Sequence, residues 1–153
     1  MAKFIYKMQS ILDIKYKMEE QAKSVYAEAT FKLREEEKKL EKLCERKHEY
    51  EEKLRNIISS LLDVLKIKEC ENAIETIKFS IKMQTLEVKK AEQNVENTRM
   101  KLNEVMIDRK THEKLREKAF EEFLIELGVE ERKEIDELIS FKYNKPVGSE
   151  EDA

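Results

Sequence analysis

The sequence has 153 residues, of which 42% are Asp, Glu, Lys or Arg, with 2 Gly, 1 Pro and no Trp. A compact domain of this length needs several turns, and turns are rich in glycine and proline, so the composition argues against a compact globular fold. The 31 basic and 34 acidic residues are interleaved, whereas a nucleic-acid-binding protein carries a basic face or a basic excess. This composition is typical of long or coiled-coil helices.

No stretch of the sequence approaches the roughly 18 apolar residues that a membrane-spanning helix requires. The N-terminus, Met1-Ala2-Lys3-Phe4, lacks the apolar region of a secretory signal. Two cysteines, at positions 44 and 70, are too few for a disulfide framework. We therefore expect a cytoplasmic protein.

A regular apolar pattern runs from Ile5 to Val64 in alternating steps of three and four residues. Roughly three quarters of these positions are apolar, about twice the chance frequency at this composition. The pattern predicts a first helix over about residues 4–58, with an apolar seam that repeats every 3.5 residues and therefore supercoils left-handedly. Polar residues at some seam positions are expected to fix the register at a cost in stability. In this helix they are Lys15, Glu19, Glu36 and Lys47.

The pattern changes register after Val64. The next seam position is Lys68, and the apolar residues now fall one position earlier. Ser60 and Asp63, both favoured at helix N-termini, lie beside the change. We predict that the first helix ends here and that a turn spans about residues 59–63.

A second helix is predicted over about residues 64–127, ending or bending at Gly128, because glycine costs nearly 1 kcal/mol relative to alanine inside a helix. A helical continuation is expected over 130–142, followed by a disordered tail over 144–153. The polar residues at seam positions of this second helix are Gln84, Thr98, Arg109 and His112.

The distribution of charge favours a chain that doubles back. Residues 1–17 carry a net charge of about +3 and residues 126–153 about −5. An antiparallel hairpin brings these segments side by side, whereas a straight helix separates them. We therefore predict an all-α fold, a long antiparallel two-helix coiled-coil hairpin over residues 1–143. The alternative is an uninterrupted helix that forms a parallel dimer.

Catalytic and metal-binding patterns are weak throughout. The two histidines, His48 and His112, lie on or beside the two seams, and each has at best one cysteine near it, without Cys-x-x-Cys spacing. A two-helix seam offers no pocket in which a nucleophile and a base could meet, and there is no glycine-rich phosphate loop. We expect no enzyme activity, no metal and no cofactor.

Both ends of the predicted hairpin carry more apolar residues than one seam can cover. Dense apolar groups occur in residues 1–12, in 120–127 and again in 135–143. One interpretation is ordinary packing between the two ends. The other is an apolar tip that inserts into another protein.

Three segments make the sequence similar to the flagellar export protein family FliJ. They are Phe4–Leu12 with the Glu19-Glu20 pair after it, Cys70–Gln84 at the start of the second helix, and Lys133–Tyr143. Length and layout agree over nearly the whole chain. The resemblance implies an antiparallel two-helix coiled coil similar to the gamma stalk of rotary ATP synthases, acting in the flagellar type III export apparatus.

The resemblance also implies partners for this chain. Members of the family bind the hexameric export ATPase FliI with the end formed by the two termini, contact the export gate protein FlhA through the early part of the second helix, and in some cases bind export chaperones. For this chain it implies a gate contact at Ile77, and a protein located at the inner face of the cell membrane only through its partners. The residues implied for the ATPase contact are Phe4, Met8, Leu12, Ile135 and Leu138.

Two rival functions follow from the same pattern. A purely structural coiled coil that self-associates in a scaffold would be an elongated dimer or larger oligomer. Nucleic-acid binding through lysine-rich turns would give salt-sensitive retention on DNA.

Overall fold

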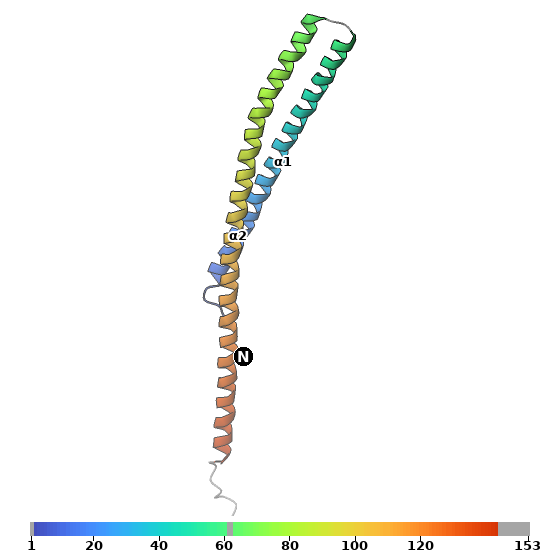
Figure 1. Ribbon diagram of the computed structural model, residues 1–153. Helices are drawn as coiled ribbons and strands as arrows, with labels where there is room; N and C mark the ends of the chain where they lie inside the picture. The colour runs from blue at the N-terminus through green and yellow to red at the C-terminus, as the bar shows by residue number, and fades with distance from the viewer. Residues whose placement is uncertain (1, 61–62, 144–153) are drawn as a thin grey trace, which may run out of the picture. The chain divides into compact units, whose positions relative to one another are not determined.

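The computed structural model describes residues 2–60 and 63–143. Helix α1 spans Gln9–Ser60 and helix α2 spans Val64–Tyr143. The two helices run antiparallel and pack against each other (Figure 1). The predicted all-α helical hairpin is therefore confirmed. Part of the predicted turn, residues 61–62, and the predicted tail, residues 144–153, lie outside the described residues.

The contacts divide the chain into two units. Unit 1 combines residues 1–16 with 107–153, and unit 2 comprises residues 17–106. Each therefore joins a piece of α1 to a piece of α2.

The core of unit 2 is the predicted seam. Its buried side chains on α2 follow one another at steps of 4, 3, 11, 3 and 14 residues, all of which fit a repeat of 3.5 residues, so that they share one face of the helix. Full burial of an isoleucine or valine side chain stabilises the folded state by about 1.5–3 kcal/mol relative to exposure, so a few such residues hold a long pair of helices together. The buried apolar residues of unit 2 are Ala29, Cys70, Ile74, Ile77, Val88, Ala91 and Val105.

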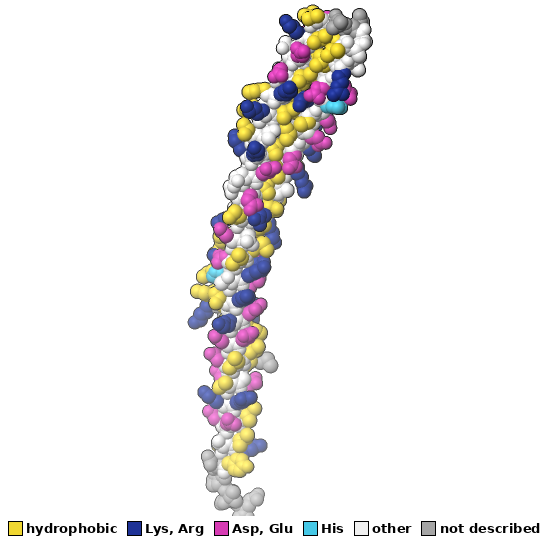
Figure 2. Space-filling view, in the orientation of Figure 1, with side chains coloured by type: hydrophobic (Ala, Val, Ile, Leu, Met, Phe, Trp, Pro, Cys, Tyr) yellow, Lys and Arg dark blue, Asp and Glu magenta, His cyan; other side chains and the backbone are white. Residues whose placement is uncertain are grey.

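On the face that Figure 2 shows, charged side chains of both signs lie along both helices, with exposed apolar side chains between them. Many form i,i+3 or i,i+4 pairs, such as Glu96–Arg99 at 2.6 Å and Glu87–Lys90 at 3.3 Å. Exposed pairs of this kind add only about 0.3–0.5 kcal/mol each, so they support the helices without determining the fold.

Asp63 caps the start of α2. Its carboxylate accepts hydrogen bonds from the backbone N–H groups of Leu65 and Lys66, at 3.2 and 3.5 Å. Ser60, considered above as a capping residue for the second helix, instead belongs to the last turn of α1. Its hydroxyl donates to the carbonyl of Asn56, one turn earlier in the same helix, at 2.7 Å.

The N-terminal boundary of α1 differs from the sequence expectation. The helix begins at Gln9, later than the expected residue 4. Residues before Gln9 leave the helical path, and the ring of Phe4 packs against the rings of Phe120 and Phe123 of α2, with centroids 5.1 and 5.4 Å away. Aromatic contacts of this kind add about 0.5–1.5 kcal/mol beyond area burial, which offsets the loss of one further helical turn.

Gly128 does not end α2, which continues to Tyr143. The backbone at this glycine is not in the positive-φ region. The residues that follow, Glu130 to Lys133, are mostly strong helix formers, and a single glycine costs only about 1 kcal/mol. The cost of one glycine was too small to break the helix.

The charge distribution predicted that residues 1–17 lie beside the acidic C-terminal segment, and over the described part of that segment, residues 126–143, this prediction is wrong. Contacts of the N-terminal segment reach Asp108, Glu113, Arg116 and Phe123, and none reaches the described acidic residues 126–143. Over residues 2–60 and 63–143, the apolar seam and these local contacts join the two helices, and pairing between residues 1–17 and the acidic residues 126–143 does not contribute.

Candidate partner-binding surfaces

An aromatic cluster anchors the N-terminal segment in unit 1. Phe120 meets Phe4 edge-on at an interplanar angle of 71°, and Phe123 lies beside both. The guanidinium of Arg116 lies 5.8 Å from the Phe4 ring centroid, within reach of a cation–π contact. The apolar excess in residues 1–12 and 120–127 is therefore used, in part, for packing between these two segments.

Polar contacts continue this attachment along α1. The ammonium of Lys15 lies 2.7 Å from a carboxylate oxygen of Asp108, and its hydrogen bond holds the pKa of that carboxyl below its ordinary value. The phenol of Tyr16 donates a hydrogen bond to Glu113, which raises the tyrosine pKa. Arg116 donates to the side chain of Gln9 at 2.8 Å. The N-terminal part of α1 is thus held by contacts that respond to salt and pH.

The last part of α2 presents apolar side chains that no described residue covers. Every residue from Val129 to Tyr143 is exposed, and Figure 1 shows this end of α2 in orange as a single helix. Ile135 is 55% exposed and Leu138 is 64% exposed. Exposed apolar groups at helical spacing mark a site of protein–protein contact more often than scattered single residues do. The large apolar residues exposed from Leu124 onward are Leu124, Ile125, Val129, Ile135, Leu138, Ile139, Phe141 and Tyr143.

The five residues implied for an ATPase contact have different environments. Ile135, Leu138 and Met8 are exposed, and Phe4 is half-buried against the aromatic cluster. Leu12 is only 2% exposed and belongs to the core. Its place on the predicted seam is consistent with this buried position.

Ile77, the residue implied for a gate contact, is also in the core, with 6% of its surface exposed. Three large apolar side chains close to it in sequence are exposed instead, namely Phe79, Met83 and Leu86. They follow each other at steps of four and three, outside the seam. Sequence reasoning missed this second apolar line, although the same spacing rule would have found it.

The residues considered for chemistry lie apart from one another. His48 pairs with Glu52 at 3.2 Å and His112 with Asp108 at 3.6 Å, each within one turn of its own helix. Within residues 2–60 and 63–143, no group of three or more His, Cys, Asp or Glu side chains could hold a metal ion. In the same residues, no helix is apolar over a length sufficient to cross a membrane.

Comparison with known proteins identifies the family. The family model described as "Flagellar FliJ protein" matches residues 4–148, nearly the whole chain. No curated protein and no solved structure gives a significant match. The matched range includes both helices, the aromatic cluster and the exposed end of α2. This chain belongs to the FliJ family, and it is a component of flagellar protein export.

Proposed function

We propose that this chain is a non-catalytic link in flagellar type III export, which binds the hexameric ATPase FliI with the residues of unit 1 and contacts the export gate protein FlhA with unit 2. ATP hydrolysis belongs to the partner ring. The chain acts in the cytoplasm, at the inner face of the cell membrane at the flagellar base, and reaches the membrane only through its partners. Its role is to couple hydrolysis in the ring to the state of the gate.

The observation that carries the ATPase contact is the uncovered apolar end of α2. Ile135 and Leu138 lie three residues apart, on one face of the helix, and both are exposed. An amphipathic helix of this kind binds by laying its apolar face into a groove or ring opening of a partner. Met8 adds an exposed apolar side chain at the start of α1. Leu12 and Phe4 contribute to the ATPase contact indirectly, since they pack inside unit 1 and hold the N-terminal segment on α2.

The gate contact is proposed for the part of α2 around Ile77. Because Ile77 itself is buried, the side chains that meet FlhA are the exposed neighbours Phe79 and Met83. Ile77 then acts by holding α2 against α1, so that these neighbours face outward. Export chaperones are a further class of partner that we propose for this chain.

The direct test mixes the purified chain with its cognate FliI and measures ATP turnover and co-elution. We expect the full chain to co-elute with the ATPase and to stimulate turnover. Ile135→Ser combined with Leu138→Ser removes both exposed apolar groups and is expected to abolish both effects while leaving most of the helicity of the chain intact. The matched control is Thr111→Ser combined with Ser140→Ala, which changes two side chains on α2 without removing a large apolar group.

Two outcomes would contradict the proposal. If the full chain neither binds FliI nor changes its turnover, the ATPase contact does not exist. If sedimentation shows an elongated dimer that the double serine variant converts to a monomer, the apolar end serves self-association, and the scaffold function is the better description.

A further inference from the structure

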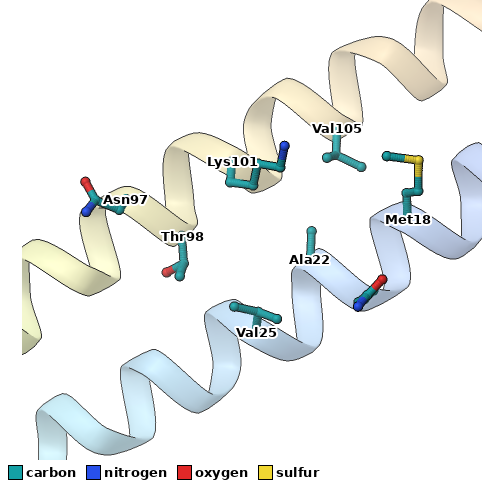
Figure 3. Close-up of a pocket in the computed structure, with 8 residues that line it drawn as sticks. Met18, Ala22, Val25, Asn97, Thr98, Lys101 and Val105 are labelled. Atoms are coloured by element: carbon teal, nitrogen blue, oxygen red, sulfur yellow. The ribbon is translucent and has the colours of Figure 1, made fainter.

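A hollow of about 380 Å³ lies between α1 and α2 in unit 2. Figure 3 shows Met18, Ala22 and Val25 on the α1 side, facing Thr98, Lys101 and Val105 on the α2 side. Val105 is buried, while Met18 and Val25 remain exposed at 39% and 45%. The feature is therefore a groove along the helix pair, with apolar side chains at its base and along its α1 edge.

The composition of this groove is unusual for the chain. Lys101 is the single charged residue among the eight that line it, whereas 42% of the whole sequence is charged. Gln21 and Asn97, which complete the lining, are uncharged amides. For comparison, five of the six residues around a hollow beside Phe31 on α1 are charged. Depletion of charge and enrichment of methionine distinguish the centre of a protein interface from ordinary surface.

The spacing along α1 points to a third helix. Met18 and Val25 are seven residues apart and lie beside the seam rather than in it. A two-helix coiled coil needs two apolar positions per heptad, and a third such position is typical of a helix that packs against two neighbours in a bundle. Ala22 and Thr98 are short, so that the space between the helices stays open for a side chain from outside.

The charge of Lys101 indicates which charge a side chain bound in the groove should carry. It has no ion pair with any residue of the described ranges. We propose that the groove binds an amphipathic helix of another protein, with a leucine-sized side chain seated over Ala22 and a carboxylate one turn away that pairs with Lys101. This docking surface is independent of the proposed ATPase contact, because all its residues belong to unit 2.

The test uses two three-heptad amphipathic peptides with leucine at the seam positions. One has glutamate a turn after its central leucine and the other has lysine there. Fluorescence anisotropy with the full chain is expected to show tighter binding of the glutamate peptide, by about threefold, as a partly exposed ion pair gives. Lys101→Glu is expected to reverse that preference, and Lys89→Glu, on an exposed position away from the groove, is the matched control.

The second arm of the test fills the groove. Ala22→Leu is expected to weaken binding of the glutamate peptide by about 10-fold, since it occupies the space of the incoming leucine. Ala27→Leu makes the same substitution at an exposed position of α1 outside the groove and is expected to leave binding unchanged. If Ala22→Leu lowers helicity, Val25→Gln, which replaces an exposed wall residue by a polar one, is measured instead and is also expected to weaken binding.

Three results would overturn the inference. They are absence of binding of either peptide to the wild-type chain, equal effects of Ala22→Leu and Ala27→Leu, and a wild-type dimer that Ala22→Leu converts to a monomer. The third result would assign the groove to a second copy of this chain. None of them bears on the FliI experiment, so this proposal and the proposed function fail separately.

Discussion

The side-chain amide of Gln84 on α2 donates hydrogen bonds to Glu36 on α1, to its backbone carbonyl at 3.0 Å and also to its carboxylate. These residues are 48 positions apart in the sequence and lie opposite each other across the seam of unit 2. Both interrupt the apolar pattern. Each would be unfavourable against an apolar partner, so their pairing makes one alignment of the helices better than the alignments shifted by a turn.

A double-mutant cycle should detect this pairing. Glu36→Ala and Gln84→Ala are each expected to lower the midpoint of thermal unfolding measured by circular dichroism. The double variant should be no less stable than the worse single variant, because the second substitution removes a group that has already lost its partner. Strictly additive losses would show that the two side chains stabilise the hairpin independently.

Stability should fall on acidification through the same pair. The hydrogen bond from Gln84 holds the pKa of Glu36 below its ordinary value of 4.5, so the folded state favours the carboxylate. A depressed folded pKa contributes stability that is present above 4.5 and is lost as the pH falls through the folded value. Thermal unfolding of the wild type and of Glu36→Gln should therefore differ most at neutral pH and converge below pH 4.5. A difference that is constant with pH would contradict this.

Leu12 and Leu138 should separate packing from partner binding. Leu12→Ala removes a fully buried side chain and is expected to destabilise the hairpin by about 2–5 kcal/mol. Leu138→Ala removes an exposed side chain, so its effect on stability should stay within about 0.5 kcal/mol, while co-elution with FliI weakens. Chemical denaturation and co-elution measured on both variants check the contrast, which fails if Leu138→Ala destabilises as much as Leu12→Ala.

Ile77→Ala and Phe79→Ala should separate packing in unit 2 from contact with FlhA. The substitution leaves a cavity in the core of unit 2 and is expected to cost about 2–5 kcal/mol. Phe79→Ala removes an exposed side chain and should change stability by less than about 0.5 kcal/mol, yet weaken binding to the cytoplasmic part of FlhA. Binding by Phe79→Ala equal to that of the wild type would remove this residue from the proposed gate contact.

Gly128 offers a stabilising substitution. A Cβ added there meets no heavy atom within 4 Å, so alanine fits without strain. Gly128→Ala is expected to stabilise the helix locally by about 1 kcal/mol. Hydrogen exchange of the amides in residues 124–143 measures this directly and should slow relative to the wild type, whereas exchange in unit 2 should not change.

The helical hairpin was predictable because its seam is periodic over many turns. Leu12, Ile74, Ile77 and Val88 each lie on a seam position of the sequence, and each is buried. A long regular pattern averages over the polar interruptions, so that no single residue decides the prediction. The register change near Val64 was equally readable, since Asp63 is a strong N-cap.

The ends were harder to predict, since single contacts decide them. Phe4 leaves the helix to reach Phe120, a contact between residues far apart in sequence that no local pattern encodes. Leu12 and Ile77, which the resemblance implied as contact residues, are both buried, so their burial does not follow from the resemblance. Whether an apolar residue is buried depends on its place relative to the seam. Leu12 and Ile77 lie on seam positions and are buried, whereas Phe79, Met83 and Leu86 lie outside the seam and are exposed.

The single-helix end of α2 has a consequence for how the chain meets a partner. Most helical stability in proteins comes from packing of the apolar face, and residues 129–143 are all exposed. Their helical order therefore rests on intrinsic propensity and on continuation from the packed turns before them. Binding that covers Ile135 and Leu138 supplies the missing packing, so part of the binding free energy goes into ordering this segment. The affinity for a partner is then adjustable by helix propensity alone, without any change in the residues that touch it.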